Sequence, residues 1–196
     1  MTAANDDNDP GRRLAALARS TPWFHHALRA ARDLGLADWC IGAGAVRNLV
    51  WDALHRYATP SALPDVDLAF FDAGDLSPAR DRALQARVQA ACPSLRWEVV
   101  NQAAVHTWFE AHFGHAVAPL RSLEEAVASW PEFATAVGVS LATDDTIRVL
   151  APHGLDDLFG MLVRRNPVRA SLATWRERVE GKRYAQRWPR VRVVEE

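Results

Sequence analysis

Apolar residues in the first third of the chain change between helical and strand spacing. From residue 12 to residue 36 they follow helical spacing, with a break at Thr21 and Pro22, which together form a typical helix start. An apolar run over 39–41 has the length of a short strand, and helical spacing returns over 46–54. The pattern predicts two helices, a strand and a third helix, in that order.

The rest of the chain continues this mixture. Val66, Leu68 and Phe70 alternate with other residues in a predicted strand over 65–71. Ser77 before Pro78 is a typical start for a helix that reaches about residue 91. Further predicted elements are a strand over 95–100, helices over 101–113 and 122–130, a hairpin of strands over 135–141 and 146–150, and helices over 154–163 and 170–187. The expected fold class is mixed α+β.

Composition indicates one globular domain. The chain has 196 residues, of which 49% are hydrophobic and 24% charged. Residues 1–10 are acidic and polar, unlike a signal peptide, and we expect a disordered lead-in before a domain over 11–163. No apolar run approaches the roughly 20 residues of a membrane-spanning helix, so we expect a cytoplasmic protein without a membrane partner. Cys40 and Cys92 form no CxxC pair, which favours reduced thiols.

Charge is distributed unevenly although the net charge is only −1. Residues 164–192 contain ten Arg or Lys against two Glu, whereas residues 1–163 contain 13 basic and 20 acidic residues. A basic helical segment over 164–196, packed on the same domain, could bind phosphates or nucleic acid. It could equally be a solvated segment lying against the acidic body.

Two aspartates in the predicted strand over 65–71 indicate a metal site. Asp65 and Asp67 are two positions apart, so they share one face of a strand at a spacing of about 7 Å. Such carboxylates repel each other, and a divalent cation is the usual compensation. Glu98, in the next predicted strand, is the expected third ligand of a two-metal phosphoryl-transfer site. The alternative is that Asp65 and Asp67 form a solvated strand face.

A turn of small residues precedes these aspartates. Gly42 and Gly44 allow backbone N–H groups to approach a phosphate, and the helix that follows adds its positive end. Arg47, one turn into that helix, could reach a phosphate oxygen. A Gly-x-Gly sequence also occurs in turns without any ligand. In this order, however, the turn, the helix and the paired carboxylates describe a site for a metal-chelated nucleotide.

These stretches resemble the signature of the DNA polymerase β-type nucleotidyltransferase superfamily, whose tRNA CCA-adding members have a similar turn before Asp-x-Asp. The longer pattern is more similar to a bacterial nucleotidyltransferase-like family, and it covers about residues 38 to 192. The superfamily signature is carried by GAGAVRN at 42–48 and DVDL at 65–68. The stretches that match the bacterial family are GAVRN at 44–48, VWD at 50–52, DVD at 65–67, FD at 71–72, WEV at 97–99, NQA at 101–103, His106, WP at 130–131, AVGV at 136–139, AP at 151–152 and GLDDLF at 154–159.

This chain departs from the family pattern at several positions. Ala43 stands where the superfamily often has glycine or serine, and Asn48 replaces an aspartate of the CCA-adding turn. Ala104 and Val105 stand where family members often have Arg and Met, which removes a possible basic contact to phosphate or acceptor. His106 lies among apolar residues and is interpreted as a packed helix histidine.

The resemblance implies a mixed β-sheet flanked by helices and a Mg²⁺- or Mn²⁺-dependent enzyme that moves a nucleotidyl group from an NTP to a hydroxyl acceptor. Asp65, Asp67 and Glu98 would be the metal ligands and catalytic residues, and Gly42, Gly44 and Arg47 would hold the triphosphate. The acceptor is open among small molecules, RNA and protein. Two other functions stay open, namely a nucleotide- or RNA-binding module without turnover and a regulatory protein such as one half of a toxin–antitoxin pair.

Overall fold

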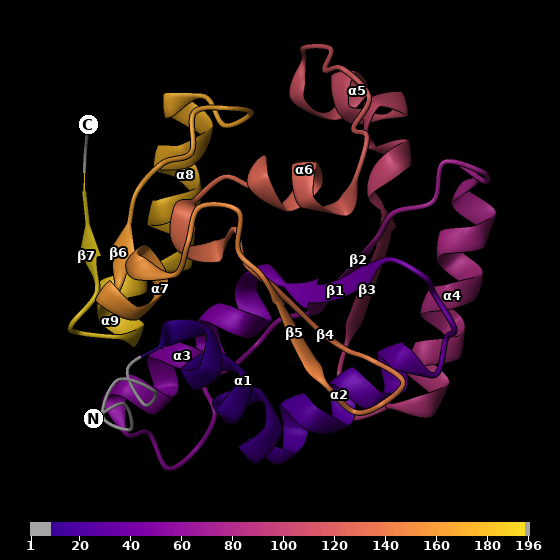
Figure 1. Ribbon diagram of the computed structural model, residues 1–196. Coiled ribbons are helices and arrows are strands. Elements are labelled where there is room, and N and C mark those ends of the chain that lie inside the picture. The colour runs from indigo at the N-terminus through magenta and orange to yellow at the C-terminus, as the bar shows by residue number, and fades with distance from the viewer. Residues whose placement is uncertain (1–8, 195–196) are drawn as a thin grey trace, which may run out of the picture.

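The computed structural model describes residues 9–194 (Figure 1). Its helices are α1 (Pro10–Ser20), α2 (Pro22–Arg32), α3 (Ala43–His55), α4 (Pro78–Ala91), α5 (Phe109–Phe113), α6 (Leu123–Ala128), α7 (Asp156–Gly160), α8 (Leu172–Lys182) and α9 (Tyr184–Arg187), with 3₁₀ turns η2 (Gln102–Thr107) and η3 (Phe133–Thr135). Its strands are β1 (Trp39–Gly42), β2 (Val66–Phe70), β3 (Trp97–Asn101), β4 (Gly138–Leu141), β5 (Ile147–Leu150), β6 (Leu162–Val163) and β7 (Arg192–Val193). Residues 1–8 of the predicted lead-in lie outside the described residues, whereas α1 begins at Pro10 with Asp9 as its N-cap.

The central sheet has five strands in the order β3-β2-β1-β4-β5. Strands β2 and β3 are parallel, and the other neighbours in this sheet are antiparallel. Helices lie around the sheet, with α1 and α2 near β5 and β4, and α4 beside β3 (Figure 1). The predicted mixed α+β fold, a mixed sheet flanked by helices, is confirmed.

The strand alternation separates the core from an open face. Val66, Leu68 and Phe70 are each about 1% exposed and pack with the helices in the main core. On the opposite face of the sheet, Ala69 packs with Cys40 and residues of α6 in a smaller cluster. Asp65, Asp67 and Ala69 have the same parity along the strand, so the two aspartates belong to the face that carries the smaller cluster.

Helix α4 protects the outer edge of the sheet. The side chains of Asp81, Gln85 and Gln89 recur at four-residue spacing, so they lie along one face of α4. They accept hydrogen bonds from the backbone N–H groups of residues 101, 99 and 97 of β3 at 3.2, 3.2 and 3.3 Å. These bonds satisfy backbone donors that an edge strand would otherwise expose, and they fix the strand that carries Glu98.

Three predicted elements are divided differently in the structure. The helix predicted over 101–113 is the 3₁₀ turn η2 followed by the short helix α5, because the Asn101 side chain caps η2 at the N–H of Ala103. The helix predicted over 154–163 ends at Gly160, because its C-cap Met161 has a left-handed φ of 54°, and residues 162–163 pair with β7 instead. Arg183, with a φ of 51°, separates α8 from α9. Among the described residues, no helix is long and apolar enough to cross a membrane.

Candidate functional site

The structure brings Asp65, Asp67 and Glu98 together. Because β2 and β3 are parallel neighbours, Asp67 lies opposite Glu98 in the register. One carboxylate oxygen from each of the three residues lies within 4.8 Å of the other two. Asp65 and Asp67 are half-buried and Glu98 is exposed, so the cluster opens on one side.

The electrostatics of this cluster suit a hard cation. Burial raises the pKa of the Asp67 carboxyl to about 6, and the charges of Asp65 and Glu98 add to that shift. The charge of Arg178 and a hydrogen bond from the Gly44 N–H act in the opposite direction. Carboxylate oxygens are the preferred ligands of Mg²⁺, and a bound divalent cation would offset the mutual repulsion. The donor set therefore fits the predicted divalent metal.

The two glycines of the turn have different roles. Strand β1 ends at Gly42 and α3 begins at Ala43, as the sequence predicts. A Cβ atom on Gly42 would overlap the indole ring of Trp130, so Gly42 is required for packing and does not line the cleft described below. A Cβ atom on Gly44 would meet its nearest neighbours, in Arg47 and Leu63, only at 3.6 Å. Packing therefore leaves space for a side chain at Gly44. That space is part of the cleft, because Gly44 lines it.

Arg47 lies deeper than the sequence suggests. Its side chain is 1% exposed, and its Nη2 and Nε atoms donate to the Asn48 side-chain oxygen at 2.8 and 3.3 Å. The guanidinium carbon is 5.7, 5.1 and 5.3 Å from the ring centroids of Trp51, Tyr184 and Trp188. Arg47 still borders the cleft beneath Gly44, but these contacts hold its guanidinium in an aromatic cage.

The loop before Asp65 is fixed by α3 and the C-terminal segment. Asp52 accepts hydrogen bonds from the Ser61 N–H at 2.8 Å and from the Ser61 hydroxyl at 2.6 Å. The Trp188 indole N–H donates to the same carboxylate at 2.7 Å. Arg187 adds a hydrogen bond to the carbonyl of Ala62 at 2.6 Å. Residues distant in sequence thus hold the segment that leads into Asp65.

A cleft of about 400 Å³ joins the carboxylates to the turn and to α8. It is lined by Ala43, Gly44, Arg47, Leu63, Pro64, Asp65, Asp67, Leu68, Ala69, Glu98, Val100, Gln102, Trp108, Phe113, Trp130, Pro131, Thr135, Arg178 and Lys182. Arg178 and Lys182 are the cations that the basic segment brings to this cleft. Their four-residue spacing, which puts both on one face of a helix, is the signal that could have singled them out in the sequence. Burial lowers the pKa of Lys182, and the nearby Arg178 charge acts in the same direction.

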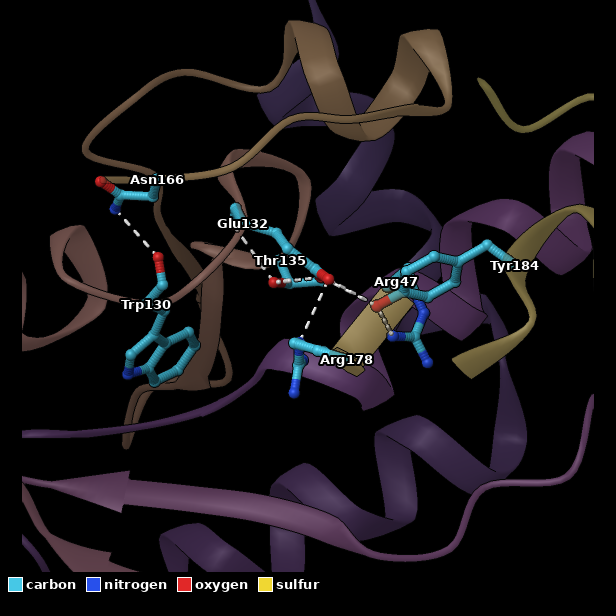
Figure 2. Close-up of polar contacts among 7 residues, drawn as sticks. All are labelled: Arg47, Trp130, Glu132, Thr135, Asn166, Arg178 and Tyr184. Carbon is cyan, nitrogen blue, oxygen red and sulfur yellow. Dashed lines mark hydrogen bonds and ion pairs between the residues drawn. The ribbon is translucent and has the colours of Figure 1, made fainter. Parts of the chain in front are cut away.

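A buried glutamate fixes Arg178 (Figure 2). Glu132 is 0% exposed, and it accepts hydrogen bonds from Arg178 Nε at 3.1 Å and from the Tyr184 hydroxyl at 2.9 Å. The Thr135 hydroxyl donates to the same carboxylate at 3.3 Å. Figure 2 shows the end of the Arg178 guanidinium group directed away from Glu132. Sequence reasoning did not single out Glu132, which has no motif of its own beyond the preceding Trp130 and Pro131.

His106 is the remaining candidate. It is half-buried in η2, and its Nδ1 atom has no hydrogen-bond partner among the described residues. It is not one of the residues that line the cleft. Its position agrees with a packed residue, although the hydrogen bond expected of a satisfied histidine is not formed at Nδ1.

Comparisons with known proteins agree with this geometry. A family model described as "Nucleotidyltransferase" matches residues 29–193, which include every residue that lines the cleft. An NMR structure described as revealing "a CCA-adding enzyme head domain" is similar to this chain with a TM-score of 0.80 and 28% sequence identity. The similarity covers 94% of this chain and 96% of that chain. No curated protein matches this chain.

Proposed function

This chain belongs to the nucleotidyltransferase family that matches residues 29–193, and on that premise we propose that it moves a nucleotidyl group from an NTP to a hydroxyl acceptor with the help of Mg²⁺ or Mn²⁺. The observation that carries the proposal is the set of carboxylates within 4.8 Å of one another in a cleft that also contains Arg178 and Lys182. Carboxylates that bind a cation and side chains that bind phosphate thus face one space. The similarity to a CCA-adding enzyme head domain supports the same reaction class.

In this proposal different residues of the cleft bind the cation and the phosphates. Asp65, Asp67 and Glu98 would hold the divalent cation, which when bound neutralises phosphate charge and makes the acceptor hydroxyl more acidic. Arg178 and Lys182 would bind the β- and γ-phosphates, in place of the basic contact missing at Ala104. The hydroxyl oxygen forms a bond to the α-phosphorus, the bond to the β-phosphate oxygen breaks, and pyrophosphate leaves as the hydroxyl proton passes to solvent.

The turn and its helix would support the triphosphate from the other side. Gly44 lines the cleft without a side chain, so its backbone leaves space for a phosphate group. Arg47 would add positive potential from beneath the turn instead of a direct contact, because its N–H groups are bound to Asn48 and Tyr184. Gly42 would act indirectly, by allowing Trp130 to pack against the start of α3.

The decisive test replaces both aspartates of the carboxylate cluster. Asp65→Asn with Asp67→Asn keeps the side-chain shape and removes two negative charges, so metal-dependent transfer should fall by at least about a thousandfold. Label transfer would be measured from labelled NTPs with Mg²⁺ or Mn²⁺ and cell extract as the source of acceptor. Asp33→Asn with Asp144→Asn is the matched control, because both carboxylates are exposed and lie outside the cleft. Equal transfer by the cleft variant and the unmodified protein would contradict the proposal.

A second candidate is RNA binding without turnover, favoured by a neighbouring basic hollow. This hollow is lined by Pro64, Gly181, Lys182, Arg183, Gln186 and Arg187, and it shares Lys182 with the cleft. A binding module would retain single-stranded RNA in the variant lacking Asp65 and Asp67, and it would bind less tightly as salt rises. It would also transfer no label in its unmodified form, whereas the enzyme would.

A further inference from the structure

The cleft has an aromatic wall that the proposed phosphate chemistry does not use. Trp108 and Phe113 both line it, and they are 42% and 43% exposed. They come from the end of η2 and from α5, whereas the cations Arg178 and Lys182 come from α8. Figure 1 shows α5 and α8 as separate helices above the sheet. One cleft therefore has cationic and aromatic linings from two different parts of the chain.

The aromatic wall is supported from behind. Phe109 is 8% exposed, and its ring centroid lies 4.4 Å from that of Phe113 and 6.2 Å from that of Trp108. The Arg169 guanidinium carbon is 5.5 Å from the Phe109 ring centroid, and its Nη2 donates to the carbonyl of Ala118 at 3.2 Å. These contacts restrain Trp108 and Phe113 without covering them. Both rings therefore keep exposed area, and both line the cleft.

The lining changes in character along the chain from β3 to α5. Glu98 and Val100 lie on one face of β3, and Gln102, Trp108 and Phe113 follow them in the lining. This one stretch of chain thus brings a carboxylate, an aliphatic, an amide and two aromatic side chains to the cleft. Together with Arg178 and Lys182 of α8, this lining suits a ligand with a polyanionic end and a flat aromatic end.

We infer that Trp108 and Phe113 form the nucleobase subsite for the incoming NTP, on which the base stacks while the triphosphate faces the carboxylates and α8. This inference rests on the proposed function and specifies which part of the substrate each wall receives. Stacking on an aromatic ring is tolerant of base identity because every base has a π face. All four NTPs should therefore gain affinity from this wall.

The test compares NTPs with inorganic tripolyphosphate, which has the same charged end and no base. Isothermal titration would use the full chain with Mg²⁺ and no acceptor. The unmodified protein should bind each NTP more tightly than tripolyphosphate. Trp108→Ala should weaken NTP binding by about five- to a hundredfold and leave tripolyphosphate binding unchanged. Trp108→Phe, which keeps a ring, should retain most of the NTP affinity.

A control and two contrary outcomes complete the test. Leu76→Ala removes a side chain that is 37% exposed outside the cleft, and it should change neither affinity. If the unmodified protein binds NTPs no more tightly than tripolyphosphate, or if Trp108→Ala affects both ligands equally, the subsite is wrong while the proposed function survives. If neither ligand binds the unmodified protein, the proposed function fails together with the subsite.

Discussion

Ala43 has a backbone conformation that glycine adopts more easily. Its φ of 47° lies in the left-handed region. That conformation costs an L-residue roughly 1–2 kcal/mol, and glycine avoids most of this cost. The start of α3 therefore contains local strain directly beside Gly44, in the part of the turn that borders the cleft.

Replacing this alanine should stabilise the protein. Ala43→Gly should raise the free energy of unfolding by up to about 1 kcal/mol, since relief of strain exceeds the added flexibility of the unfolded chain. Ala53→Gly changes an exposed position of the same helix where the backbone is regular. This variant should lower the free energy of unfolding by about 1 kcal/mol, because glycine is unfavourable inside a helix. Urea unfolding measures both values. A loss of stability in both variants would show that Ala43 is not strained.

At the scale of elements, α8 is held in position by an ion pair between Arg178 and a buried glutamate. Glu132 precedes η3, and its carboxylate holds Arg178 of α8 and Tyr184 of α9. The segment that contains Glu132 is also held by Asn166. Its Nδ2 donates hydrogen bonds to the carbonyl oxygens of Ala128 and Trp130 at 2.6 and 2.9 Å. The proposed phosphate-binding face of α8 therefore depends on a segment that contributes few charges to the cleft itself.

Breaking this pair should be costly. Glu132→Gln removes the negative charge from a buried group that holds the half-buried Arg178 and the Tyr184 hydroxyl, so the free energy of unfolding should fall by about 1.5–3 kcal/mol. Adding Arg178→Met should recover part of the loss, because no uncompensated charge then remains. Glu125→Gln breaks the exposed pair with Arg121, which is 87% exposed, and should lower the free energy of unfolding far less than Glu132→Gln does. Urea unfolding measures the free energy of unfolding of each variant. If Glu132→Gln with Arg178→Met loses as much of it as Glu132→Gln alone, this account is wrong.

At the scale of the whole molecule, the cleft joins distant parts of the chain. Its lining extends from Ala43 to Lys182 and includes residues of α3, β2, β3, α5 and α8. A ligand that contacts several of these elements binds the folded state alone. Nucleotide binding should therefore be coupled to global stability.

This coupling predicts a thermal shift. At roughly a hundred times Kd, Mg²⁺ with NTP should stabilise the fold by about 2.7 kcal/mol, which raises Tm by about 5–10 °C for a chain of this size. The variant with Asp65→Asn and Asp67→Asn should show little shift, because its carboxylates no longer hold the cation. Differential scanning calorimetry provides the measurement. An equal shift in that variant would indicate that the nucleotide binds elsewhere.

Local sequence determined the elements and the identity of the carboxylates. Alternation over 65–71 and 95–100 predicted the strands that carry Asp65, Asp67 and Glu98, and β2 and β3 form there. The proline and glycine signals located the starts of α2, α3 and α4 to within a few residues. These features depend on residues close together in the chain, where periodicity and capping act directly.

Tertiary structure alone decided how these elements meet. The register that places Asp67 opposite Glu98 depends on strand pairing, with α4 fixing the edge of β3. Arg47 was expected beside phosphate, but aromatic residues from α3 and from the C-terminal segment enclose it. The pairing of Glu132 with Arg178 joins residues 46 positions apart. Such contacts depend on the packing of the whole chain, because no local sequence pattern predicts which charged residues will pair.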